Sequence, residues 1–261
     1  GIADDVAVGI RNPLGADQAL LRPSLLAGLL GAVAHNLRHG VLSVRLFELG
    51  RVFGAAGREE QTALALVATG TAAPGSWRSD ARESDFYDIK GVLRAVLGDV
   101  RFEPEGSGGM TLRVEGSGIN GVVRRLPNDL AEAHEAKVPV YYAEVLVDAW
   151  LEQADPVAHV KPLPKFPATA RDLTAILPST TAYARLEEVL WSARAPHLQE
   201  VSLKGIFTDS TGRKLETSQR ALTVTLTFRD DARTLTAVEV DRAMETLRDH
   251  AKAELGAVFR G

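Results

Sequence analysis

The sequence predicts an α+β fold made of two domains in tandem, and three observations support this prediction. Residues 166–261 alternate between strand and helix patterns in the order β-α-β-β-α-β. Residues 1–155 mix helical stretches with several short strands, which is typical of antiparallel hairpins packed with helices. Residues 156–165 contain three prolines, which fix extended backbone and predict a semi-rigid linker between the two domains.

Composition narrows the class of protein. The 261 residues include no cysteine, so disulfides, thiolate nucleophiles and cysteine metal sites are excluded. The longest apolar stretch, Leu25 to Ala34, is shorter than the ~20 residues that a membrane helix needs, and no secretion signal opens the chain. We therefore expect no membrane partner and a cytoplasmic location.

The net charge of −4 is unevenly distributed. Residues 163–261 hold 14 Lys+Arg and 13 Asp+Glu, a charge of +1, whereas residues 1–162 hold 16 and 21, a charge of −5. Neither part has the dense positive field of a stand-alone nucleic-acid binder. Any RNA binding should therefore depend on local geometry within a larger assembly.

The first domain is predicted to open with a helix near Pro23, a residue suited to a first helical turn. Its apolar positions follow at helical spacing and are Leu25, Leu26, Leu29, Leu30, Val33 and Leu37. Such a wide stripe predicts close packing against other elements or another chain. A second helix follows Asp85, and the residues of its predicted apolar face are Ile89, Val92, Leu93, Val96 and Leu97. Strands are predicted over residues 64–68, 110–114, 121–126 and 140–147.

In the second domain, two helices carry apolar stripes at helical spacing. Their residues are Leu186, Val189, Leu190 and Ala193 in one helix and Val240, Ala243, Met244, Leu247 and Ala251 in the other. Thr236 and Glu239 form a capping-box pattern that starts the second helix. Strand 222–228 places alternate apolar residues under the helices. The opposite face is predicted to be polar and open, with Thr223, Thr225, Thr227, Arg229, Asp172, Thr174, Lys204 and Thr208.

No candidate catalytic pattern has the context that its chemistry requires. Residues 116–121 match G-x-G-x-x-G, but a strand ending at Pro127 follows where a dinucleotide loop needs a helix, which favours a hairpin turn. His35 and His39 have the spacing of two helical metal ligands, yet no third ligand is near. Asp85 and Asp88 could pair as carboxylates, although an N-cap role for Asp85 is favoured. We expect no catalytic residue and no metal in this chain.

Short sequence motifs, each occurring once, are distributed along nearly the whole chain. In the first domain they are Asn12-Pro13-Leu14, residues 21–30, residues 46–53, Trp77 and residues 85–91; in the second they are residues 166–173, 203–207, 233–236 and 256–260. In this order they resemble the C-terminal part of the bacterial phenylalanine–tRNA ligase beta chain. That part consists of a non-catalytic class II synthetase-like domain followed by a ferredoxin-fold anticodon-binding domain.

The sequence departs from this family at two places. Lys204-Gly205-Ile206-Phe207 stands where the family tends to have Phe-Asp-x-Tyr, so the acidic side chain and the phenol hydroxyl are missing. The segment around residues 103–110 is shorter than its counterpart.

The resemblance implies a place for this chain within a larger enzyme of two alpha and two beta chains. That enzyme joins phenylalanine to its tRNA with ATP and Mg²⁺, at an active site on the alpha chain. This chain is expected to be a fragment that binds no cofactor and is inactive alone. Leu46 agrees with this expectation, because class II synthetases clamp ATP with an arginine two residues before a glutamate such as Glu48.

The expected partners are the alpha chain and phenylalanine tRNA. Candidate contacts to the alpha chain are Leu25, Leu29, Leu30, Val33 and Phe47. Candidate contacts to RNA are Arg171, Lys204, Arg213, Lys214, Arg220 and Arg229. Two alternatives remain open: any one of these cations could be ordinary solvated surface, and the chain could be a stand-alone interaction or regulatory protein that reuses both domains without binding tRNA.

Overall fold

The computed structural model describes residues 8–15, 19–54, 60–98, 100–105, 111–116, 118–153 and 163–260. The chain divides into two compact units, Gly1–Ala158 and His159–Gly261, which are described separately below. Most of the predicted linker, residues 156–165, lies outside the described residues.

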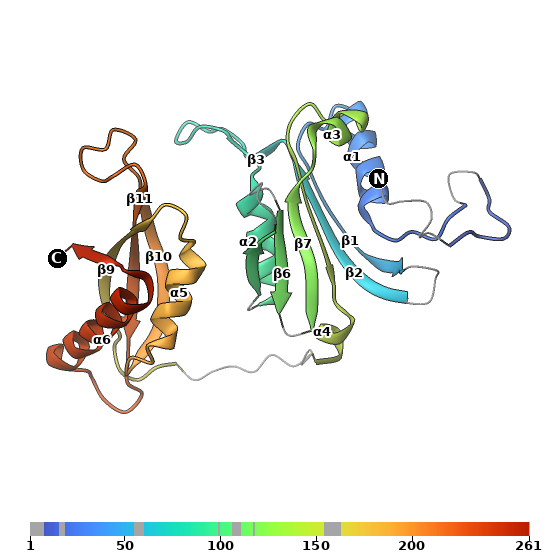
Figure 1. The fold of residues 1–261 in the computed structure, drawn as a ribbon. Helices are drawn as coiled ribbons and strands as arrows, with labels where there is room; N and C mark the ends of the chain where they lie inside the picture. The colour runs from blue at the N-terminus through green and yellow to red at the C-terminus, as the bar shows by residue number, and fades with distance from the viewer. Residues whose placement is uncertain are drawn as a thin grey trace. The chain divides into compact units, whose positions relative to one another are not determined.

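The first unit is built on a six-stranded antiparallel sheet with the strand order β1-β2-β8-β7-β6-β5 (Figure 1). Its strands are β1 (Val44–Phe53), β2 (Glu60–Thr69), β5 (Arg101–Pro104), β6 (Thr111–Gly116), β7 (Ile119–Arg125) and β8 (Val140–Leu146). A separate two-stranded sheet pairs β3 (Thr71–Ala73) with β4 (Arg82–Glu83). This arrangement confirms the predicted mixture of helices and antiparallel hairpins.

Two helices cover opposite faces of the six-stranded sheet, as Figure 1 shows. Helix α1 (Leu26–Arg38) packs with Ala63, Ala65 and Val67 of β2, whereas α2 (Phe86–Leu97) packs with Leu66 and Ala68. The alternation along β2 supplies both cores from one strand, because successive side chains of a strand point to opposite faces. Two short helices complete the unit, α3 (Asn128–Ala133) and α4 (Asp148–Gln153).

Helix α1 begins at Leu26 rather than at the predicted Pro23, and a half-buried carboxylate, Glu144, holds the residues that lead into it. Oε2 of Glu144 accepts hydrogen bonds from Oγ of Ser24 at 2.7 Å and from the N–H of Leu25 at 3.1 Å. The hydroxyl of Tyr142 donates to the same oxygen, and burial, followed by the bond to Glu144, raises the pKa of Tyr142. A carboxylate at a helix start satisfies free N–H groups and favours the helix dipole.

Helix α2 begins as predicted but buries a narrower face. Asp85 is its N-cap, which accepts from the N–H groups of Tyr87 and Asp88 and forms a capping box with Asp88. Val92 and Val96, which were expected on the buried face, are 46% and 51% exposed. The apolar contacts of α2 with the sheet come from a narrower stripe, Phe86, Ile89, Leu93 and Leu97.

Strands β6 and β7, which carry most of the glycine-rich stretch, form a hairpin, as predicted. Strands β6 and β7 pair antiparallel with Gly116 opposite Ile119. Gly121 is required for packing, because a Cβ there would lie 2.2 Å from the carbonyl oxygen of Glu144 on β8. Strand β7 follows the glycines in sequence, where a dinucleotide loop needs a helix.

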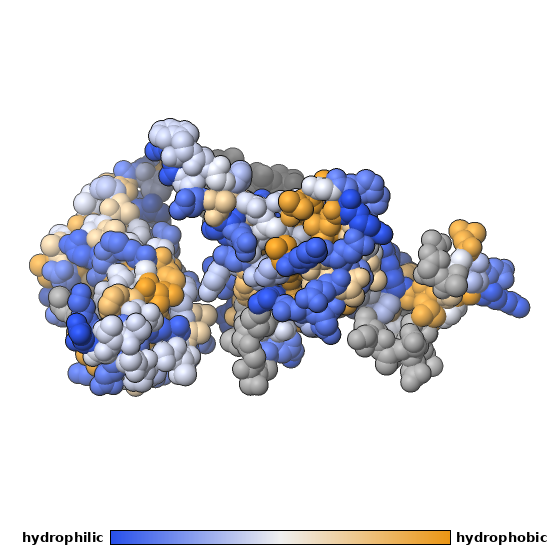
Figure 2. Space-filling model, turned by 90° about the horizontal axis from the view of Figure 1, so that it is seen from above, coloured by the Kyte–Doolittle hydropathy of each residue, from blue (hydrophilic) through white to orange (hydrophobic). Residues whose placement is uncertain are grey.

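The second unit has the predicted β-α-β-β-α-β order. Its antiparallel sheet has the order β10-β11-β9-β12, from strands β9 (Thr169–Pro178), β10 (Leu198–Phe207), β11 (Gln219–Phe228) and β12 (Val258–Arg260). Helices α5 (Tyr183–Ser192) and α6 (Ala237–Leu255) bury the predicted stripes against one face, and the capping box of Thr236 and Glu239 is present. Seen from above, both units show a mainly hydrophilic surface with smaller groups of apolar residues (Figure 2).

Candidate nucleic-acid interface and partner surface

The second unit leaves one face of its sheet without a helix. Leu222, Val224, Leu226 and Phe228 of β11 lie in the core under α5 and α6. The intervening Thr223, Thr225 and Thr227 therefore point to the opposite face, where Thr223 meets Thr174 of β9 with 2.9 Å between hydroxyl oxygens. The predicted polar face is confirmed by this register.

Lys204 lies on this open face and is held by an acidic neighbour. Its Nζ forms an ion pair with Oδ2 of Asp172, and Oδ1 of Asp172 accepts from the hydroxyl of Thr225 at 2.7 Å. Lys204 reaches from β10 across β11 to β9. The hydrogen bond from Lys204 and then that from Thr225 lower the pKa of Asp172, so the carboxylate stays charged near neutral pH.

A β-bulge in β10 brings an aromatic residue to the same face. The register with β11 shifts between Leu203 and Gly205, after which Phe207 pairs with Ala221 on the open face. In a regular strand, Lys204 and Phe207 would point to opposite faces; the bulge places both on one. Phe207 is 47% exposed. The sequence analysis missed it because alternation alone cannot locate a bulge, although Gly205 is a signal of one.

Two of the predicted RNA contacts do not lie on the open face. Arg171 pairs with Leu226, a core residue, so strand alternation puts it on the helix side, where it is exposed. Arg220 shares the parity of Leu222 and donates from Nη2 to the carbonyl oxygen of Thr181 before α5. Arg171 and Arg220 therefore do not share the open face with Lys204, because strand alternation directs both to the side of the helices.

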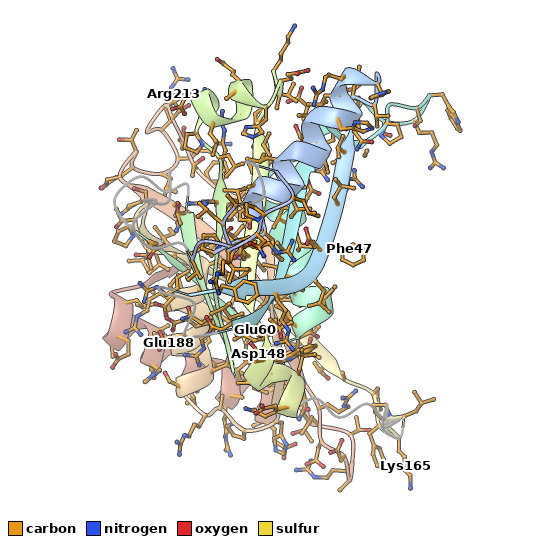
Figure 3. The ribbon with its side chains drawn as sticks, turned by 90° about the vertical axis from the view of Figure 1, so that its right-hand side faces the viewer. Phe47, Glu60, Asp148, Lys165, Glu188 and Arg213 are labelled. Atoms are coloured by element: carbon orange, nitrogen blue, oxygen red, sulfur yellow. The ribbon has the colours of Figure 1, made fainter. Side chains whose placement is uncertain are left out.

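The other three predicted cations lie outside the strands, one just after β11 and two in the loop between β10 and β11. Arg229 is half-buried just past β11, and its backbone N–H donates to the carbonyl oxygen of His197 at 2.9 Å. Arg213 and Lys214 are exposed in the loop between β10 and β11, where Figure 3 shows Arg213 at the loop's end. These positions are compatible with phosphate contacts.

That loop is ordered by a single carboxylate. Asp209 accepts from the N–H and the hydroxyl of Thr211, at 2.8 and 2.5 Å, and from the N–H of Lys214 at 2.6 Å. The Thr211 hydroxyl, followed by the Lys214 N–H, lowers the pKa of Asp209 to about 2. Leu215 then packs on Ile176 and Ala221 at one end of the open face.

Four of the five predicted alpha-chain contacts are buried within this chain. Leu25, Leu29, Leu30 and Val33 are 0–4% exposed and pack against β1, β2 and β8. Side chains covered by their own sheet cannot present a docking surface, so the apolar stripe of α1 is core. The fifth residue, Phe47, is 74% exposed, and Figure 3 shows its ring standing clear of β1.

Phe47 belongs to an apolar surface along the outer edge of the sheet. The N–H of Phe53 bonds the carbonyl of Arg22, and Arg22 Nε bonds the carbonyl of Arg51, so the backbone N–H and C=O groups of the odd-numbered residues of β1 point away from β2. Among the described residues, none bonds the outward N–H groups of Phe47 and Leu49. An open strand edge is a template for pairing with another chain.

Phe47 and Leu49, the exposed large apolar residues of β1, are here called the β1 patch.

Leu46 and Glu48, the two positions compared with an ATP clamp, make other contacts here. Glu48 bonds Arg22 at 2.6 Å, and Leu46 packs against the α1 core.

The rings of His35 and His39 lie together with 4.3 Å between their centroids, and Nδ1 of His39 lies 2.8 Å from the carbonyl oxygen of His35. Within the described ranges, no three His, Asp or Glu side chains gather as a metal site, and no helix is long and apolar enough to span a membrane.

Comparison with known proteins places both units. Residues 3–151 match the family described as the phenylalanyl tRNA synthetase beta chain CLM domain, and residues 164–260 match the ferredoxin-fold anticodon binding domain. Phenylalanine–tRNA ligase beta subunits of Moorella thermoacetica and Salinibacter ruber are 33% and 30% identical over 97% of this chain. The chain spans 33% of the length of each of these relatives.

A solved pyrrolysyl-tRNA synthetase of Desulfitobacterium hafniense aligns with a TM-score of 0.43 at 20% identity, over 57% of this chain and 53% of that one. The family matches cover both units in the order that the sequence motifs predicted. The chain belongs to the phenylalanine–tRNA ligase beta subunit family and corresponds to its C-terminal part.

Proposed function

We propose that this chain is a non-catalytic part of phenylalanine–tRNA ligase that binds the anticodon arm of tRNA and docks on the catalytic alpha chain. The observation that carries the RNA-binding role is the open face of the second unit, within the region that matches an anticodon-binding family. On that face a cation and an aromatic ring, Lys204 and Phe207, lie on the same strand.

The proposed chemistry is that of single-stranded RNA recognition. Phe207 stacks on one base of the anticodon loop, and Lys204 neutralises a nearby phosphate. Arg213 and Lys214 contact the backbone from the loop that Asp209 orders. Because this half of the chain carries a charge of only +1, few phosphates are contacted and binding by the isolated unit is weak and salt-sensitive.

The test compares two activities of the complete enzyme reconstituted with this chain. Lys204→Ala and Phe207→Ala are expected to lower kcat/KM for tRNA charging about tenfold each, since stacking on one base is worth roughly 1–3 kcal/mol. Phenylalanine-dependent pyrophosphate exchange, which needs no tRNA, should not change. Arg185→Ala, on an exposed position of α5, is the control.

Unchanged charging in both variants would favour the solvated-surface interpretation and the alternative of an interaction protein without tRNA. Equal loss of charging and exchange would point to a defect in assembly.

The proposed docking surface for the alpha chain is the β1 patch. Phe47 and Leu49 are 74% and 57% exposed on a strand whose outer edge is open, and such an edge accepts a strand or a helix from another chain. Phe47→Asp is expected to weaken binding of the alpha chain at least tenfold, as measured by titration calorimetry, with an unchanged melting temperature. Arg38→Asp, on the exposed side of α1, is the matched control.

ATP and Mg²⁺ are assigned to the alpha chain. The residues of this chain do not fit an ATP clamp, because Leu46 has no charge and the carboxylate of Glu48 forms an ion pair with Arg22. We therefore expect this chain alone to give no pyrophosphate exchange.

A further inference from the structure

A hairpin projects from the first unit and exposes a tryptophan at its end. The hairpin, here called the arm, comprises residues 71–84 with strands β3 and β4, and Figure 1 shows it extending away from the six-stranded sheet. Trp77 is 92% exposed, with the guanidinium carbon of Arg78 5.4 Å from its ring centroid. Neither the family matches nor the proposed RNA site assigns it a role.

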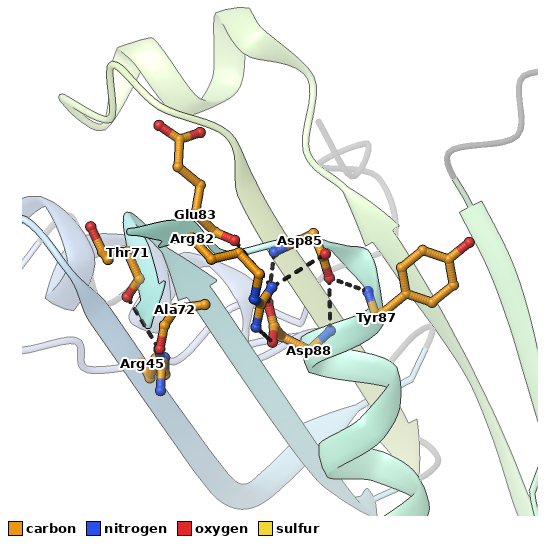
Figure 4. A network of polar contacts seen from close by, with 8 residues as sticks. All are labelled: Arg45, Thr71, Ala72, Arg82, Glu83, Asp85, Tyr87 and Asp88. Carbon is orange, nitrogen blue, oxygen red and sulfur yellow. Dashed lines mark hydrogen bonds and ion pairs between the residues drawn. The ribbon is translucent and has the colours of Figure 1, made fainter. Parts of the chain in front are cut away.

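The base of the arm is firmly attached to the sheet. Arg45 of β1 donates from Nη2 to the carbonyl oxygens of Thr71, at 3.1 Å, and Ala72 (Figure 4). The N–H of Ser84 donates to the carbonyl oxygen of Gly70 at 2.7 Å. Gly70 has a φ of +77°, and a Cβ there would lie 2.1 Å from the carbonyl oxygen of Leu42, so the start of the arm accepts only glycine.

The returning strand is attached to α2 by charge. Arg82 donates to Asp88 through both terminal nitrogens, at 2.6 and 3.0 Å, and lies 3.3 Å from Asp85, as Figure 4 shows. The hydrogen bond from Arg82 lowers the pKa of Asp88, so this attachment persists at neutral pH. Both strands of the arm are therefore fixed at their base.

The end of the arm is also ordered by its own bonds. The N–H of Ser76 donates to the carbonyl oxygen of Ser79 at 2.8 Å, and the N–H of Arg78 donates to Oγ of Ser76 at 3.2 Å. Trp77 lies inside this turn. Burial in the folded chain does not account for the position of the Trp77 ring, because the ring is exposed to water. Because the backbone around it is already ordered, binding through this ring would cost less conformational entropy.

The charge of the arm favours a protein partner over RNA. Residues 71–84 contain Arg78 and Arg82 against Asp80 and Glu83, a formal charge of zero, whereas RNA binding draws on an excess of cations. Tryptophan is among the residues that most often dominate the binding energy of protein interfaces, where it fills a pocket.

We propose that Trp77 is a second anchor for the alpha chain and inserts into an apolar pocket of that chain, with a carboxylate at the pocket rim for Arg78. The inference rests on the proposed docking through the β1 patch. The base of the arm lies beside the β1 patch, because Arg45, which holds that base, is two residues before Phe47 on the same face of β1.

The experiment measures the dissociation constant between the alpha chain and this chain by titration calorimetry. Trp77→Ala is expected to raise it at least about 30-fold, the range of an interface hot spot. Trp191→Ala, a 43% exposed tryptophan in the second unit, should leave it unchanged. Melting temperatures should match that of the wild type for both variants, because neither side chain is in a core.

The outcomes separate this inference from the proposed function. If Phe47→Asp weakens binding and Trp77→Ala does not, the arm is no anchor, although docking through the β1 patch stands. If the wild-type chain does not bind the alpha chain, both fall. If Trp77→Ala leaves alpha-chain binding intact but weakens binding of phenylalanine tRNA, the arm contacts RNA and the inference is overturned.

Discussion

Two anions compete for Lys204, the carboxylate of Asp172 and the phosphate proposed as its RNA contact. The ion pair with Asp172 crosses the open face, and both partners are about half exposed. An exposed pair is weak, so a phosphate can replace the carboxylate at small cost. Asp172 therefore sets how readily Lys204 becomes available.

At the residue scale, Asp172→Asn is expected to strengthen binding of phenylalanine tRNA by this chain up to about fivefold, since the competing charge is removed. The binding should also fall more steeply with salt, because a free Lys204 adds roughly 0.7 to the slope for a single strand. Fluorescence anisotropy over a salt series measures both quantities.

The double variant Asp172→Asn/Lys204→Ala is the control and should lose the gain. The pKa of Asp172 is lowered, so its charge is present above its usual pKa and is lost only as pH falls through the lowered value. The effect of the substitution should therefore be constant between about pH 6 and pH 8. Weaker binding by Asp172→Asn would instead mean that Asp172 orients Lys204 for RNA.

At the scale of elements, α1 has the role of a core helix. Its apolar stripe lies against β1, β2 and β8, and its start is fixed by Glu144. The stripe alone could not reveal what covers it, because an interface helix and a core helix have the same apolar period. For the same reason, the predicted buried face of α2 was too wide. Val92 and Val96 fit the helical period but are exposed.

Leu29→Ala is expected to lower the free energy of unfolding of the first unit by about 2–5 kcal/mol, the usual cost of a cavity at a buried leucine. Urea denaturation followed by circular dichroism measures it. Ala27→Ser, on the exposed side of α1, should change stability by less than about 0.5 kcal/mol. If Leu29→Ala lost alpha-chain binding without losing stability, α1 would be part of the interface with the alpha chain.

Strand β10 shows where alternation fails as a guide to function. The pattern correctly placed the threonines of β11, which pairs in unbroken register with β9. On β10 the extra residue at the bulge changes which side chains share a face, and Phe207 joined Lys204 there. Edge strands carry such bulges more often than central ones, so an edge is where sequence alternation is least informative.

For the whole molecule, the sequence predicted two α+β units because several independent signals agreed. The capping box, the apolar stripes and the alternating strands of the second unit all pointed to one topology. Exposure was harder to predict. Phe47 was grouped with four residues of the apolar stripe of α1 as a partner contact, but those four are buried, and only Phe47, on the edge strand β1, is exposed.

The open edge of β1 has a consequence for the cell that makes this chain. A strand edge with free N–H groups beside a 74% exposed phenylalanine attracts other strand edges, including those of newly made copies. Arg45 and Arg51 on the same strand oppose such pairing by charge but leave the edge open. If the alpha chain covers this edge as proposed, copies made in excess of that chain are exposed to aggregation and proteolysis, which favours matched production of the two chains.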